Sequence, residues 1–404
     1  MSAAEPRLSV RVGRIAPSPM LKLAAKAASL KAAGHDIISL ATGEPDFDTP
    51  EHIRRAACSA IEGGDTHYTA VDGTAPLKAA IVRKFRRDNG LEFRPDQISV
   101  GAGAKQVIFN ALAATIDDGD EVIVATPTFP SYIEIVRMFG GTPVIVETGS
   151  ETGFRLEPAA LKQAITPRTK WIILNAPGNP SGAVYSRDQL KALAEVLLAN
   201  EHVWILADDI YEHLVYAEVG FETIAAVEPR LAGRTLTVNG VSKAYCMTGW
   251  RIGYAGGPTS LVTAMATVQS QVTSCSSSIS QAAAVAALDG PQDVLHSLRD
   301  AFRARRDAVV EALAKIPGVE CQVPDGAFYA FPSCKRLIGL TMPGGEPISG
   351  DRDFAAYLLE AAGVIVVPGS DFGTPGHFRI SYAADTAELL EAVRRIGVAV
   401  SALS

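Results

Sequence analysis

Cysteine is scarce in this chain of 404 residues, and its few cysteines form no recognisable set. There are five, an odd number, with no C-x-x-C pair: Cys58, Cys246, Cys275, Cys321 and Cys334. This pattern argues against a disulfide framework and against a zinc site. The seven histidines are also scattered, and no H-E-x-x-H pattern occurs. We therefore expect no catalytic metal.

Long apolar runs and an excess of basic residues are lacking too. No uninterrupted apolar run approaches the length of a membrane span. The formal net charge of -7 provides no basic footprint for nucleic acid. Residues 1–14 are polar and lack the apolar core of a secretory signal. We expect a cytoplasmic protein that binds neither membranes nor nucleic acid.

The chain instead has the composition of a large globular protein. Hydrophobic residues make up 48% and charged residues 20%, and the length favours two or three domains. Short β-branched or apolar runs alternate with helical segments; they lie at residues 97–100, 121–125, 143–147, 171–174, 203–207 and 235–238. Further strands at 365–367 and 377–381 precede a last helix at 387–400. The alternation predicts an α/β fold followed by an α+β region.

The segment from Val238 to Gly253 contains a lysine suited to covalent chemistry. Lys243 follows the end of a short strand and has small and apolar neighbours. Desolvation lowers the pKa of a lysine, and its neutral amine can attack a carbonyl to form a Schiff base. Arg251, eight residues later, offers a planar fork for a phosphate or carboxylate. An aldehyde cofactor that carries a phosphate would use both side chains.

A glycine turn at 101–104, between a strand and a helix, is also compatible with a dinucleotide site. Gln106 occupies the final glycine position of that pattern, and the nearest acid, Glu121, begins its strand where the ribose-binding acid would end it. What remains is the general ability of amides at a helix N-terminus to bind phosphate.

An acidic pair, Asp208 and Asp209, closes the strand at 203–207. A carboxylate at the end of a buried strand is costly unless it has a partner, and a protonated pyridine nitrogen is such a partner. Neighbouring side chains near a strand end point to opposite sides, so we expect only one of the two to face a ring.

The stretch from Val238 to Tyr254 resembles the cofactor-lysine signature of the class I and II aminotransferases, which are pyridoxal 5'-phosphate (PLP) enzymes. The resemblance extends from about Ser18 to the last helix and is greatest to a bacterial aspartate and aromatic aminotransferase subgroup. It implies fold type I, with a mostly parallel seven-stranded sheet flanked by helices in a large domain and a smaller α+β domain. We expect residues 1–48 to contribute to the small domain, 49–290 to form the PLP-binding domain and 291–404 to form the small domain.

The resemblance also implies the roles of individual residues. Lys243 would hold the cofactor as a Schiff base and carry a proton, with Asp208 on the ring nitrogen and Tyr211 on the phenolic oxygen. The other implied cofactor contacts are Gly103, Ala104, Lys105, Phe129, Asn179, Ser242, Arg251 and, from the second subunit of a homodimer, Tyr68. The implied substrate contacts are Gly43 and Arg379 for the α-carboxylate, Lys105 for a distal carboxylate, and Asn179.

These residues predict an aminotransferase that moves an amino group from an L-amino acid to a 2-oxo acid such as 2-oxoglutarate, with aspartate as the first candidate donor. The subgroup usually has Lys or Arg and then Thr where this chain has Ala16 and Met20, which leaves aromatic or aliphatic donors open. The sequence is also compatible with a PLP-dependent lyase or synthase and with a non-catalytic sensor domain. A nucleotide-linked oxidoreductase is disfavoured by Gln106.

Overall fold

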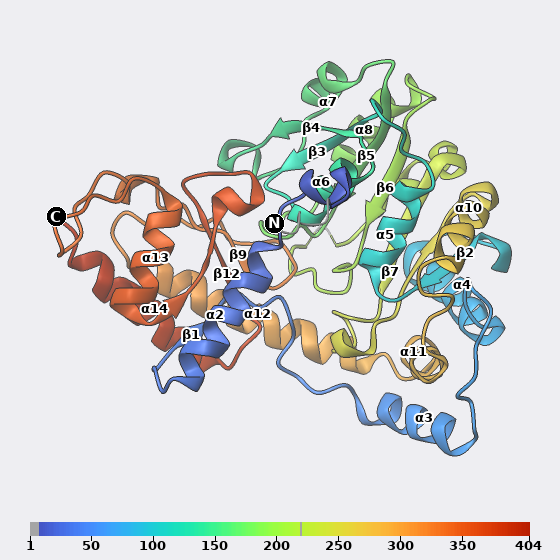
Figure 1. Cartoon of the computed structure of the whole chain (residues 1–404), viewed down its shortest axis with the longest axis horizontal. Helices are drawn as coiled ribbons and strands as arrows, with labels where there is room; N and C mark the ends of the chain where they lie inside the picture. Colours follow the sequence, from blue (N-terminus) through green and yellow to red (C-terminus); the bar gives the residue numbers. More distant parts are fainter. Residues whose placement is uncertain (1–7, 219) are drawn as a thin grey trace, which may run out of the picture.

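A seven-stranded sheet forms the centre of the larger part of the protein (Figure 1). The computed structural model describes residues 8–218 and 220–404. The strands are β2 (Ile98–Gly101), β3 (Glu121–Thr126), β4 (Thr142–Glu147), β5 (Thr169–Asn175), β6 (Trp204–Asp208), β7 (Thr235–Gly240) and β8 (Gly253–Gly256), in the order β2-β8-β7-β6-β5-β3-β4. Every neighbouring pair is parallel except the two that include β8. The predicted mostly parallel seven-stranded sheet is confirmed.

Helices cover both faces of this sheet. One buried cluster packs α5 (Ala104–Ala113), α6 (Pro130–Met138) and α10 (Thr259–Ser270) against one face. A second packs α7 (Pro158–Ala164), α8 (Arg187–Leu198) and α9 (Ile224–Val227) against the other. A third joins α3 (Glu51–Glu62), α4 (Ala75–Asn89) and α11 (Ser278–Asp289) beside β2 and β8. Because both faces are covered, the inner strands β3, β5 and β6 each contain a run of four consecutive apolar residues.

Local signals explain where several helices begin and end. The Ser186 hydroxyl accepts from the Gln189 amide, and the Gln189 side chain accepts from the Ser186 amide, which is a capping box at the start of α8. α4 starts at a Thr74 cap and ends at Gly90, where φ is 63°. Glycine adopts this left-handed conformation without a side-chain penalty.

The C-terminal region forms the smaller part, on the left in Figure 1. It contains α12 (Asp293–Leu313), β9 (Tyr329–Ala330), α13 (Asp351–Ala362), β10 (Val364–Ile365), β11 (Val367–Pro368), β12 (Phe378–Ser381) and α14 (Thr386–Ser401). The single strand predicted at 365–367 is wrong: two short strands occupy this stretch, and β10 and β11 pair with different partners. The strand β8, which the sequence did not reveal, is the antiparallel member of the large sheet.

The N-terminal segment contacts both parts of the protein. α1 (Val10–Gly13) packs against α6 of the large part, and the Ala16 amide donates to Glu134 Oε2 at 2.7 Å. α2 (Pro19–Ala32) and β1 (Ile38–Ser39) pack on the C-terminal region, where β1 pairs in parallel with β10. Ala27 and Ile37 share a buried cluster with Phe331 and Val367. The proposed domain boundaries at residues 48 and 290 remain predictions. Within the described residues, no helix is long and apolar enough to cross a membrane.

Candidate active site

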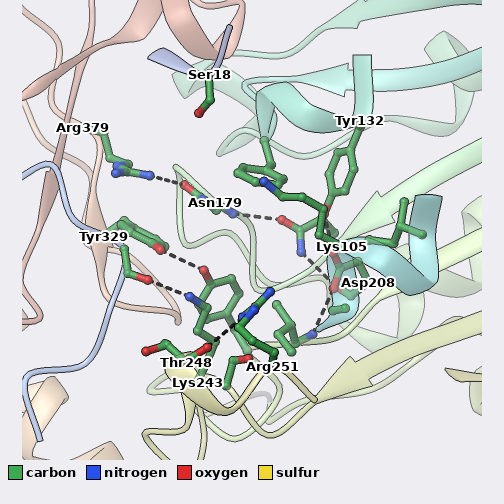
Figure 2. Close-up of a pocket in the computed structure, with 18 residues that line it drawn as sticks. Ser18, Lys105, Tyr132, Asn179, Asp208, Lys243, Thr248, Arg251, Tyr329 and Arg379 are labelled. Atoms are coloured by element: carbon green, nitrogen blue, oxygen red, sulfur yellow. Dashed lines mark hydrogen bonds between the residues drawn. The ribbon is translucent and has the colours of Figure 1, made fainter. Parts of the chain in front are cut away.

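A cavity of about 320 Å³ lies where the parallel strands of the large sheet end (Figure 2). Loops and helices that follow β2, β3, β5, β6 and β7 meet there, because the carboxyl ends of parallel strands lie at one edge of a sheet. Most of the predicted site residues line this cavity: Gly43, Ala104, Lys105, Phe129, Asn179, Asp208, Tyr211, Ser242, Lys243, Arg251 and Arg379.

Two predicted residues are not among those that line the cavity. Gly103 is the N-cap of α5, with φ 91°, and a Cβ added there would lie 2.3 Å from Arg251 Nη2. Gly103 therefore allows the guanidinium to pack against the first turn of α5. Tyr68 lies in a loop between α3 and α4, and its side chain is 92% exposed. Its predicted contact with a second subunit stays a prediction.

The amine of Lys243 points into the cavity from the loop that follows β7. Its Nζ donates to the Gly43 carbonyl at 2.6 Å and lies 6.0 Å from the Tyr211 ring centroid. Burial lowers the pKa of Lys243 to about 8; Glu44 opposes this decrease, and Arg251 and Arg379 add to it. With that pKa, roughly a tenth of the amine is neutral at pH 7 and able to act as a nucleophile.

Asp208 is a buried carboxylate at the end of β6. It is 5% exposed, and burial raises its pKa to about 6. The Tyr132 hydroxyl donates to Asp208 Oδ2 at 2.5 Å and the Ile210 amide to Oδ1 at 3.3 Å, and both hydrogen bonds oppose that increase. Asp209 is buried but does not line the cavity, as the resemblance together with strand alternation predicted.

Tyr132 is a site residue that the sequence did not indicate. The only local signal was its place on α6 just after the Phe129 loop, because a buried tyrosine usually finds a hydrogen-bond partner for its hydroxyl.

Basic groups gather at the start of α5. Arg251 Nη1 donates to the Thr248 carbonyl at 2.8 Å and Nη2 to the Ala102 carbonyl at 3.3 Å. Lys105, which is exposed, has its Nζ 4.9 Å from the centroid of the Phe129 ring. Desolvation and the charge of Arg251 lower the pKa of Lys105. Helix amides, Arg251 and Lys105 together make this end of the cavity suited to an anion.

A second cation approaches the cavity from the C-terminal region. Arg379 on β12 is fully buried, donates from Nη1 to Asn179 Oδ1 at 3.0 Å and also donates to the Ala41 carbonyl. Its Cζ lies 4.6 Å from the centroid of the Tyr329 ring. The side-chain alternation on this strand predicted that Arg379 faces a site or solvent, and it faces the site. Lining residues that had no predicted role include Tyr329, Thr248, Asn175 and Ser18.

Behind the Tyr211 loop lies a buried ion pair between Lys84 and Glu212, whose side chains are 1% and 3% exposed. Burial opposes ionisation of Glu212, but the charges of Lys84 and His213 outweigh it and lower its pKa. Asp88, Glu212 and His213 bring their ligand-type atoms within 4.8 Å of one another. The Lys84 ammonium already contacts Glu212 and lies 4.0 Å from Asp88.

These features fit PLP. A phosphate suits the start of α5 beside Arg251, a pyridine nitrogen suits buried Asp208, and an aldehyde suits Lys243. Gln106, which disfavoured a dinucleotide, accepts a hydrogen bond from the Ala102 amide at 2.5 Å and so closes its own turn.

The similarity of this chain to known proteins agrees with a PLP site. Residues 35–396 match the model of the family described as aminotransferase class I and II. The chain is 56% identical to an aspartate aminotransferase of Rhizobium meliloti, over 98% of this chain and 96% of that protein. It is 53% identical to an aspartate/prephenate aminotransferase of Cereibacter sphaeroides, over 98% and 99%.

Among solved structures, an aspartate aminotransferase from Thermus thermophilus with maleate superposes with a TM-score of 0.91 at 42% identity, and the match covers 98% of this chain and 100% of that one. Because the family model spans nearly the whole chain, and the relatives and the cavity agree with it, this chain belongs to the class I and II aminotransferases and is a PLP-dependent enzyme of fold type I.

Proposed function

We propose that the enzyme transfers the amino group of L-aspartate to a 2-oxo acid, with 2-oxoglutarate as the usual acceptor. The observation that carries this proposal is that two cationic side chains, Arg379 and Lys105, line one cavity. An amino acid with a second carboxylate can use both, because each carboxylate can form a charge-assisted hydrogen bond with one of the cations. The names of the relatives from Rhizobium meliloti and Cereibacter sphaeroides, and the maleate of the Thermus thermophilus structure, support a dicarboxylic substrate.

The cofactor would be held by residues at three sides of the cavity. The amides at the start of α5, from Gly103 to Lys105, together with Ser242 and Arg251, would bind the phosphate. Asp208 would accept from the ring nitrogen, while Tyr211 and Asn179 would donate to the phenolic oxygen and Phe129 would cover the ring face. When bound, PLP supplies an electron-accepting ring that stabilises negative charge at the substrate Cα.

The reacting groups of the chain itself are few. Arg379 and the Gly43 loop would fix the α-carboxylate and thereby direct the Cα–H bond toward Lys243. The Lys243 amine, with a pKa of about 8, would take that proton from Cα and donate it to the carbon of the cofactor's aldehyde group. The Gly43 carbonyl, 2.6 Å from Nζ, would hold the lysine in place between these transfers.

A broader donor range is the second candidate. Ile108 and Phe129 give the cavity an apolar wall. Ala16, which stands where the subgroup usually has a basic residue, borders an adjacent cavity of about 310 Å³ that also includes Ser18 and Lys105. An aromatic or aliphatic side chain would fit against the wall formed by Ile108 and Phe129 at low desolvation cost. The side chain of Met20, the other departure from the subgroup, lies outside the described part of the structure.

A homodimer would complete the site. The exposed Tyr68 belongs to a loop that Gln281 holds from the protein interior: Gln281 donates to Thr69 Oγ1 at 3.0 Å and accepts from the Thr74 amide at 2.8 Å. An aromatic residue that is 92% exposed on a fixed loop suits a contact with a second copy. The partner subunit's Tyr68 would then donate to the cofactor phosphate. A cytoplasmic location remains a prediction from the sequence.

The experiment is a visible spectrum of the holoenzyme with single amino acids and no acceptor. We expect aspartate and glutamate to bleach the visible band of the bound cofactor, and 2-oxoglutarate to restore it. Phenylalanine and alanine measure the second candidate. A spectrum that phenylalanine bleaches and aspartate leaves unchanged would contradict the dicarboxylic substrate. Absence of any cofactor band, with Lys243→Ala behaving like the wild type, would contradict the role of Lys243.

A further inference from the structure

The Tyr329 side chain is a buried part of the cavity wall that the proposed reaction does not use. It is 1% exposed and lies on β9, whose pairing with β12 sets Tyr329 opposite Ser381, two residues from Arg379. Its hydroxyl oxygen lies 2.8 Å from that of Tyr211 (Figure 2). Tyr211 follows β6 of the large sheet, whereas Tyr329 belongs to the C-terminal region. This hydrogen bond therefore joins the two parts of the molecule at the site.

Tyr329 also touches two other residues of the site. The Arg379 guanidinium lies over its ring at 4.6 Å, within the range of a cation–π interaction. A Cβ added at Gly43 would lie 2.5 Å from the Tyr329 hydroxyl oxygen, so this hydroxyl rests directly against the Gly43 backbone. The Tyr329 side chain thus supports both Arg379, which is proposed to bind the α-carboxylate, and the Gly43 loop, whose carbonyl accepts a hydrogen bond from Lys243.

The number of hydroxyl hydrogens sets the direction of the bond between the two tyrosines. A phenol has a single hydrogen to donate, while its oxygen can also accept. If Tyr211 donates into the cavity, its oxygen must be the acceptor in the pair, and Tyr329 must be the donor. A hydroxyl that accepts one hydrogen bond also becomes a stronger donor in the next, because the two bonds polarise each other.

We propose that Tyr329 is a positioning residue that donates to the Tyr211 hydroxyl, turns the Tyr211 hydrogen into the cavity and supports Arg379 with its ring. The inference rests on the proposed role of Tyr211 toward the phenolic oxygen of PLP. Tyr329 acts on the cofactor only through Tyr211. Its hydroxyl and its ring therefore have separable effects.

The hydroxyl is tested by a pH titration of the visible absorbance of the bound cofactor in wild type, Tyr329→Phe, Tyr211→Phe and the double variant. Phenylalanine keeps the ring and its packing on Phe328, with ring centroids 4.7 Å apart. We expect Tyr329→Phe to raise the midpoint by about half to one pH unit, because one hydrogen bond of ordinary strength changes an equilibrium by up to about tenfold. The rise follows because the anionic phenolic oxygen loses part of its stabilisation.

The double variant should have the same titration midpoint as Tyr211→Phe alone, since the effects of substitutions at coupled residues are not additive. The matched control is Tyr357→Phe, which removes a buried tyrosine hydroxyl that donates to the Ala399 carbonyl at 2.8 Å. It should leave the midpoint unchanged.

The ring is tested by steady-state kinetics. Tyr329→Phe should lower kcat about five- to tenfold and change the KM for the amino acid by less than about twofold, because the ring stays beneath Arg379. Tyr329→Leu, which lacks the ring, should also raise that KM.

A wild-type midpoint in Tyr329→Phe, with a shifted one in Tyr211→Phe, would overturn the inference and leave the proposed function intact. Additive shifts in the double variant would also overturn it. If Tyr211→Phe itself leaves the midpoint unchanged, the proposed role of Tyr211 fails and the inference on Tyr329 fails with it.

Discussion

Removal of the Tyr132 hydroxyl should make cofactor binding more sensitive to acid. In Tyr132→Phe, Asp208 loses the hydrogen bond that Tyr132 donates at 2.5 Å, while the buried surroundings stay the same. A hydrogen bond to a charged group contributes about 1.5–3 kcal/mol, which corresponds to roughly one to two pKa units. The pKa of Asp208, raised by burial to about 6, should therefore rise further, to roughly 7–8.

The measurement is the dissociation constant of PLP for the apoprotein between pH 5 and 8.5, expressed as the ratio of variant to wild type. Ionisation of PLP itself is the same for both proteins and cancels in this ratio. At pH 8.5 Asp208 is mostly ionised in both proteins, and the ratio should be close to one. As pH falls, Asp208 protonates first in the variant, and the ratio should rise to about ten- to a hundredfold by pH 5.

A ratio that does not change with pH would refute this reasoning, because it would mean that Tyr132 acts by packing alone. The matched control is Tyr357→Phe, which removes a buried hydroxyl that donates to the Ala399 carbonyl. It should give a ratio of one at every pH.

Three further changes test other parts of the site and its support. Lys105→Met should raise the KM for aspartate about tenfold or more and change that for phenylalanine little, because only a dicarboxylate loses a charged partner; equal effects on both donors would contradict the proposed contact. Gly103→Ala should weaken PLP binding measured by fluorescence titration, since the new Cβ would lie 2.3 Å from Arg251 Nη2 at a backbone φ of 91°; unchanged affinity would mean that Arg251 does not need this position. Lys84→Met should lower the free energy of unfolding by roughly 3 kcal/mol in urea titrations, because the buried Glu212 would lose the ammonium and keep only Asn89 and His213 as partners. The control for this change is Arg55→Ala, which breaks the exposed ion pair with Glu51 and should change the free energy of unfolding by less than about 1 kcal/mol.

Much of the architecture followed from the sequence because it depends on local patterns. Strand-like and helix-like segments alternate with short connections, and parallel strands bring their carboxyl ends to one edge of a sheet. The loops that carry Asn179, Asp208 and Lys243 could therefore be expected to meet, and these residues do line one cavity. Family resemblance, rather than spacing, assigned their roles, which remain predictions.

The tertiary structure decided what local patterns could not. Tyr132 is 76 residues from Asp208, Tyr211 is 118 from Tyr329, and Lys84 is 128 from Glu212. The partner of a buried polar group depends on which elements pack together, and no local pattern in the sequence identifies it. The same reason explains why β8 and the division between β10 and β11 were missed, since short strands are defined by their pairing more than by their own residues. The sequence by itself determined the parallel strands of the sheet and the edge at which the site lies, because both follow from local patterns, and only packing decided which buried tyrosines complete that site.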